Sequence, residues 1–159
     1  MSKHSSKKFA EKWAKSNWEL LGTNPELVKR ALVVLLKTEG TAVVYADPSE
    51  IIPSSSFAWH SNFDIASGLF SSEILEVENK RFPFPAGGMF MMNPKCYSLL
   101  LSKTWNWEDF PDELGQLDGT LQHTIERLIG YIPFVQNLKQ ITYLSDEDRF
   151  TSDQSHIWS

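Results

Sequence analysis

The chain has 159 residues, 42% of them hydrophobic, and a formal net charge of −5 at neutral pH. This length suggests one domain, and the composition is sufficient for a packed core. The acidic balance argues against a nucleic-acid partner, because phosphate binding needs a broad basic face, and only a local basic patch over residues 1–15 stays open. The single cysteine, Cys96, excludes an internal disulfide and fits a reducing compartment.

No apolar run approaches the ~20 residues needed to span a bilayer, and no secretory leader is recognisable. We therefore expect a cytoplasmic protein, and peripheral association with the inner membrane face stays open. Residues 1–159 are expected to form a single domain. Its ends, 1–8 and 146–159, are predicted to be flexible because both are polar.

Predicted helices and strands alternate through the first half of the chain. A short amphipathic helix is expected over residues 9–16. A second helix should begin after Asn24, with Pro25 at its first position, and end before Gly40. The β-branched and aromatic run at 41–47 predicts a strand. A loop rich in proline and serine should follow, and residues 64–78 could hold one short helix.

The second half continues the alternation. Residues 79–87 should be extended, because a residue before proline avoids the α region. The next expected elements are a buried strand at 87–93, a helix at 94–103, a turn-rich loop at 105–116, a helix at 117–131 with Gly130 near its end, a strand at 139–145 and a polar tail. The pattern favours an α/β fold with a small mixed sheet and flanking helices.

The helix predicted over 117–131 carries Asp118, His123, Glu126 and Arg127. Asp118 could cap its start, where the helix dipole favours an acid by ~0.3–1 kcal/mol. Gly119 would allow a ligand to approach the backbone, and free N–H groups there suit a diphosphate. Glu126 follows His123 by three residues, so the two should be neighbours. On spacing alone, a solvated or salt-bridged face explains the same run.

The turn-rich loop mixes carboxylates with aromatic rings. Carboxylates beside indoles are typical of carbohydrate sites, because sugar C–H faces stack on the ring and carboxylates accept hydroxyl hydrogen bonds. A surface loop docked onto the core is an equally good interpretation. The residues concerned are Trp105, Trp107, Glu108, Asp109, Phe110, Asp112 and Glu113. In the preceding strand, Gly87 and Gly88 allow close backbone approach and could line a cleft.

Other chemistries lack their motifs. There is no phosphate-binding Gly-rich loop, no dinucleotide fingerprint and no Gly-x-Ser-x-Gly elbow. Four dispersed histidines and one cysteine make no zinc pattern. Cys96, among apolar neighbours, is expected to be a core thiol rather than a nucleophile.

Two segments resemble the rhamnan synthesis protein F family, glycosyltransferase-related proteins of bacterial surface polysaccharide synthesis. "FPAGGMFMMNPKCYSLLL" is similar to the family pattern F-P-A-G-S-M-F-W-x-R-P-x-A-L. "WEDFPDELGQLDGTLQHTIERLIGY" is similar to W-x-D-F-P-x-E-x-G-Q-x-D-G-T-x-x-H-A-x-E-R. The close likeness covers residues 84–128. Met91 and Asn93 depart from it, standing where the family has an aromatic residue and an arginine.

This resemblance implies a partial GT-A-like glycosyltransferase domain that transfers a sugar, such as rhamnose, from a nucleotide-sugar donor to a glycan acceptor. A carboxylate base would take the acceptor's proton. Asp118 is the first candidate for this catalytic role, followed by Glu113 and Asp109. His123 would bind the diphosphate or its divalent metal, Mn²⁺ or Mg²⁺. The substrate-binding candidates are Trp105, Trp107, Gly87, Gly88, Gln116, Gly119, Thr120, Glu126 and Arg127.

The donor-binding half of such an enzyme is not recognisable in this chain. GT-A enzymes carry an Asp-x-Asp metal motif on the donor side, whereas here the pattern occurs only at 146–148, in the predicted polar tail. A partner glycosyltransferase subunit or domain could supply that half. The alternative interpretation is a non-catalytic glycan-binding or complex-forming module, and a third is an inactive remnant.

Overall fold

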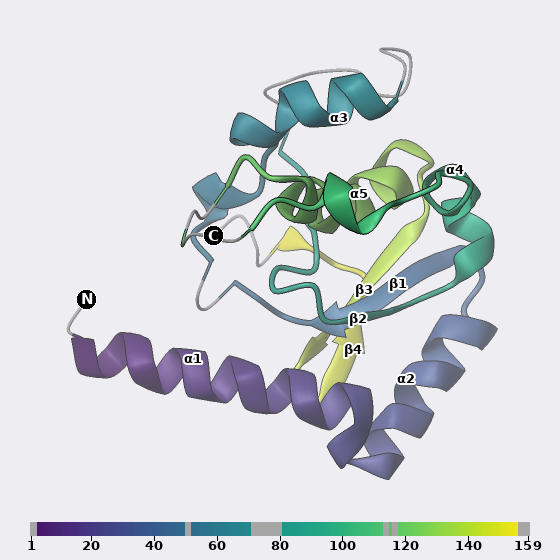
Figure 1. The fold of residues 1–159 in the computed structure, drawn as a ribbon. Coiled ribbons are helices and arrows are strands. Elements are labelled where there is room, and N and C mark those ends of the chain that lie inside the picture. The colour runs from purple at the N-terminus through teal and green to yellow at the C-terminus, as the bar shows by residue number, and fades with distance from the viewer. Residues whose placement is uncertain (1–2, 50–51, 71–80, 113–114, 116–117, 156–159) are drawn as a thin grey trace.

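A four-stranded mixed sheet with helices on both faces forms the fold (Figure 1). The computed structural model describes residues 3–49, 52–70, 81–112, 115 and 118–155. The strand order is β2-β1-β3-β4. β1 (Thr41–Ala46) and β3 (Lys139–Leu144) run parallel at the centre, and β2 (Phe90–Met92) and β4 (Arg149–Thr151) pair antiparallel at the edges. The predicted α/β class, with a small mixed sheet and flanking helices, is confirmed.

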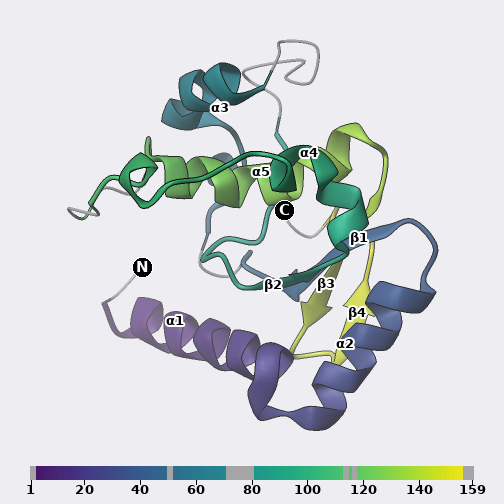
Figure 2. The same cartoon turned by 45° about the vertical axis from the view of Figure 1, so that its right-hand side comes forward.

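The helices form one layer on each face of the sheet (Figures 1 and 2). On one face lie α1 (Lys3–Trp18), a π-helical turn (Glu19–Thr23) and α2 (Pro25–Lys37). On the other face lie α3 (Phe63–Leu69), the single-turn α4 (Ser98–Leu101) and α5 (Leu121–Val135). Each face therefore has its own apolar core, one centred on α2 and the other on α5.

Local signals place the central elements where the sequence predicts them. The side chain of Asn24 accepts a hydrogen bond from the N–H of Leu27 at 3.2 Å, so α2 starts as expected. Every residue of β1 is buried, as a central strand between two helical layers should be. The helix predicted within 64–78 is α3, and residues 71–78 lie outside the described part of the chain.

Helices α1 and α5 have different bounds in the structure from those that the sequence predicts. α1 begins at Lys3 rather than residue 9, and a pair between Lys7 and Glu11 at 3.8 Å lies along it. α5 begins at Leu121 rather than 117 and continues past Gly130 to Val135. Gly130 does not end the helix. It allows a close approach of the chain, because a Cβ there would lie 2.1 Å from the carbonyl oxygen of Pro83.

The two edge strands also depart from the sequence prediction. β2 is only half-buried, because it has a neighbour on one side. β4 lies inside the predicted polar tail, where the ring of Phe150 packs 5.2 Å from that of Tyr143. Asp148 in the connecting turn pairs with Arg30 of α2 at 2.8 Å. The predicted flexibility of residues 1–8 and 146–159 remains a prediction.

In the part of the chain that the structure describes, every helix is too short or too polar to traverse a bilayer.

We expect Gly130→Ala to destabilise the fold by ~1–3 kcal/mol, because the new methyl group meets the backbone of residues 83 and 84. Urea denaturation measures the free energy of unfolding. Gly68→Ala in α3 is the matched control, since a Cβ there has open space and alanine favours a helix. A Gly130→Ala protein as stable as the control would contradict the close approach.

Candidate functional site

The start of α5 is capped by Thr120 and not by Asp118. Thr120 has an extended backbone, with φ −123° and ψ 164°, and its Oγ1 accepts the N–H of His123 at 3.3 Å. The prediction that Asp118 caps the helix is therefore wrong. Because a threonine does the capping, the Asp118 carboxylate is available for contacts outside the helix.

Asp118 ties α5 to the loop before α3. Its Oδ2 accepts the backbone N–H of Ser61 at 3.1 Å. Its Oδ1 accepts a hydrogen bond from the side chain of Asn62 and lies 3.2 Å from Nη2 of Arg127. Three donors thus converge on one carboxylate that is about a quarter exposed.

Asn62, which is not among the predicted site residues, is the fully buried centre of this contact. Its Oδ1 accepts the N–H of Gly119 at 3.2 Å and the hydroxyl of Thr124 at 3.3 Å. Its Nδ2 donates to the carbonyl of Trp59 at 3.0 Å as well as to Asp118. Both ends of the amide are satisfied, as a buried polar group requires. Nothing in the local sequence distinguishes this asparagine from an ordinary loop residue.

Arg127 is buried and forms an ion pair with Asp118, so for this residue the salt-bridged alternative is confirmed and the solvated one is wrong. Its Nε donates to the carbonyl of Ala58 at 2.9 Å, and Nη1 donates to that of His123 at 3.3 Å. Its guanidinium carbon lies 5.0 Å from the centre of the Phe84 ring, within cation–π range. Burial lowers the pKa of Arg127, and the carboxylates of Asp118 and Glu126 oppose that shift.

Glu126 connects α5 to the double-glycine turn. Its Oε1 accepts the N–H of Gly87, and Oε2 lies 4.0 Å from Nη1 of Arg127. Burial raises the pKa of Glu126, although the N–H of Gly87 and the charge of Arg127 act in the opposite direction. Gly87 has φ +86°, and a Cβ there would lie 2.3 Å from the indole of Trp13. The turn is therefore held between α5 and α1.

An open groove of about 480 Å³ lies beside this buried network. It contains four residues predicted for the site: Trp105, Asp109, Gly119 and Thr120. Lys103 lines it too, donating to the carbonyl of Leu69 and standing 5.1 Å from the Phe70 ring centre. The other lining residues are Ile65, Leu69, Thr104, Pro111 and Leu121. We call this hollow the Trp105 groove.

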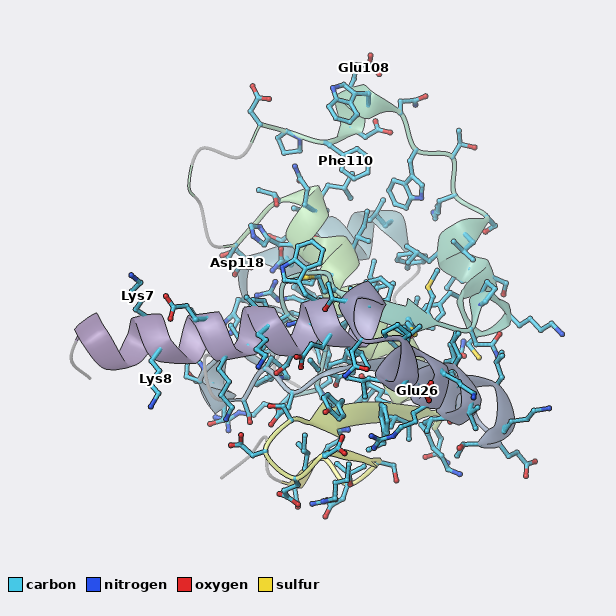
Figure 3. All side chains as sticks on the ribbon, turned by 90° about the horizontal axis from the view of Figure 1, so that it is seen from below. Lys7, Lys8, Glu26, Glu108, Phe110 and Asp118 are labelled. Carbon is cyan, nitrogen blue, oxygen red and sulfur yellow. The ribbon has the colours of Figure 1, made fainter. Side chains whose placement is uncertain are left out.

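The predicted site therefore divides into two parts that meet at Gly119 and Thr120. Asp118, Glu126 and the exposed Gly87 belong to the network around buried Arg127, whereas the Trp105 groove is open to solvent. Figure 3 shows Glu108 and Phe110 at the outer margin of the molecule, with Asp118 nearer its middle.

The other predicted site residues do not line the Trp105 groove or lie outside the described part of the chain. Trp107 is 87% exposed and is not part of the groove wall. His123 faces Thr120, with Nδ1 at 2.8 Å from Oγ1. Gly88 has φ +66° and open space around it. Glu113 and Gln116 lie outside the described residues. Within the described ranges, no three His, Cys, Asp or Glu side chains gather to hold a metal ion.

Comparison with known proteins gives one relative. The chain is 29% identical over 100 residues to the uncharacterized protein WxcX of Xanthomonas campestris pv. campestris. The match covers 63% of this chain and 14% of WxcX, so the chain spans a small part of that relative's length. No protein family matches the chain, and no solved structure matches it.

The raised pKa of Glu126 predicts how the stability of the fold depends on pH. The native state binds the carboxyl proton of Glu126 more tightly than the unfolded chain does. The stabilisation of the fold by this proton is therefore complete below the ordinary pKa of 4.5, and it is lost as the pH rises through the native pKa. Glu126→Gln has no such loss. We expect the melting temperature of the variant, relative to wild type, to rise as the pH increases above 4.5.

Thermal melts followed by circular dichroism measure this difference, and Glu108→Gln on the outer loop is the control. A difference that stays constant or falls with pH would contradict the raised pKa.

Proposed function

We propose that the Trp105 groove binds a glycan, and that the chain is the acceptor-side part of a GT-A-like glycosyltransferase of bacterial surface polysaccharide synthesis. One observation carries the proposal. Asp109, Gly119 and Thr120, from the segment that resembles the rhamnan synthesis protein F family, line a single groove together with Trp105. Asp109 therefore lies in the same groove wall as Gly119 and Thr120, which follow it by about ten residues in the sequence.

The chemistry of the groove suits a sugar. Trp105 is half-buried and packs 6.2 Å from the ring centre of Phe110, so its indole is supported as a stacking surface. The exposed carboxylate of Asp109 can accept hydroxyl hydrogen bonds, and its Oδ2 is oriented by the N–H of Asn106 at 2.8 Å. The volume lies within the ~300–1,000 Å³ usual for small-molecule sites.

In the proposed transfer, an acceptor hydroxyl oxygen forms a bond to the anomeric carbon of the donor sugar. The bond to the nucleoside diphosphate breaks, its electron pair leaves with the diphosphate, and a carboxylate takes the hydroxyl proton. Asp109 is the better base of the two described candidates, because it lines the groove. Asp118 already accepts from three donors. The described residues do not fit a metal site, because no three His, Cys, Asp or Glu side chains gather among them.

A non-catalytic glycan-binding module is the second candidate. The observation that favours it is the structural use of Asp118, the first candidate base, as an acceptor for Ser61, Asn62 and Arg127. Binding of a glycan together with a nucleoside diphosphate supports the transferase. Binding of a glycan alone supports the module.

We expect Trp105→Ala to weaken the binding of a rhamnose oligosaccharide by about two- to tenfold, since stacking on one aromatic ring is worth ~0.5–1.5 kcal/mol. Tryptophan fluorescence quenching measures the affinity, with a nucleoside diphosphate titrated in parallel. Trp18→Ala is the matched control, because Trp18 is 60% exposed and is not part of the groove wall. Unchanged affinity in Trp105→Ala, or no binding by the wild type, would overturn the proposal.

A further inference from the structure

Helix α2 is apolar on two faces. Its inner face buries Leu27 and Leu35 against the sheet. Its outer face exposes 42% of Leu32, 54% of Val33 and 69% of Leu36. At 3.6 residues per turn these three side chains are neighbours on the helix surface. Single exposed apolar residues are common, but a contiguous group of them marks a contact surface.

The outer face borders a hollow of about 450 Å³. Gly22 and Pro25 line one end, where the chain turns into α2, and Val28, Leu32 and Leu36 follow along the helix. A second hollow of about 290 Å³ lies along α2 beside Val33, Val34 and Phe150. Figure 2 shows α2 at the margin of the molecule. We call the larger hollow the α2 groove.

Two lysines give the α2 groove its charge. Lys29 and Lys37 line it, and no acidic residue does. Among the residues that the structure describes, neither lysine has an ion-pair partner. Arg30, on the same helix, differs because Asp148 accepts from it at 2.8 Å. The groove is thus apolar with unpaired positive charge along it, although the chain as a whole has a net charge of −5.

We propose that the α2 groove docks an amphipathic helix of a partner protein whose apolar row is flanked by acidic residues. α2 has 13 residues and is about 20 Å long at 1.5 Å per residue, which matches about three to four turns of a partner helix. Leu32 and Leu36 would contact the partner's apolar row. Lys29 and Lys37 would pair with its carboxylates and fix the register. The inference is independent of the proposed function.

Charge and shape distinguish this partner from two other occupants. A second copy of the chain would bring the same lysines and no acid from the facing groove. An anionic membrane would match the charge, but a flat bilayer does not fill a hollow beside Gly22 and Pro25, whereas inserted side chains do.

Fluorescence anisotropy tests the proposal with two labelled peptides. Both are 16-residue helices with one leucine row, one flanked by glutamate and the other by lysine. We expect saturable binding of the glutamate peptide at least tenfold tighter than that of the lysine peptide. Leu36→Ser should weaken it at least tenfold. Leu101→Ser is the matched control, since Leu101 is 52% exposed and is not part of the groove wall.

The double variant Lys29→Glu/Lys37→Glu should reverse the preference between the peptides, and circular dichroism checks that each variant is folded. Sedimentation and anionic phosphatidylserine vesicles test the other occupants. The proposal is overturned if neither peptide binds, if both bind equally, or if Leu36→Ser binds like wild type. A dimer or vesicle binding that Leu36→Ser abolishes would also overturn it.

Discussion

The buried guanidinium of Arg127 is the contact on which the arrangement of this molecule depends. A charge removed from water costs several kcal/mol unless its donors are paired. Here the carbonyls of Ala58 and His123, the carboxylate of Asp118 and the ring of Phe84 surround it. These partners come from the loop before α3, from α5 itself and from the extended segment before β2. One side chain therefore joins three separate parts of the chain.

The network around Asn62 and Arg127 is structural, and it lies next to the open Trp105 groove. Asn62 and Asp118 hold Gly119, and Gly119 with Thr120 forms one wall of the Trp105 groove. In the proposed function, the groove presents Trp105 and Asp109 to a ligand, and contacts behind its wall hold Gly119 in place. This division explains why ionisable groups lie beside an apolar segment. Some of them position the backbone, and the exposed ones are available for binding.

Much of the fold could be predicted, because its signals are local. The asparagine–proline start of α2, the β-branched run of β1 and the alternation of elements depend on neighbouring residues. The other features depend on distant contacts. β4 pairs with β3 and packs Phe150 on Tyr143, and position 130 needs a glycine because residues 83 and 84 lie against it. The central role of Asn62 was not predicted for the same reason, since three of its four partners are 56 to 62 residues away.

A double-mutant cycle on the Asp118–Arg127 pair, measured as the free energy of unfolding in urea, tests most directly whether this ion pair holds the start of α5 in place. Asp118→Ala alone removes the nearer of the two carboxylates beside the buried guanidinium and should cost ~3–5 kcal/mol. With Arg127→Met also present, that penalty should fall, giving a coupling of ~1–3 kcal/mol. Additive effects of the two substitutions would contradict the claim that this pair holds the start of α5 in place.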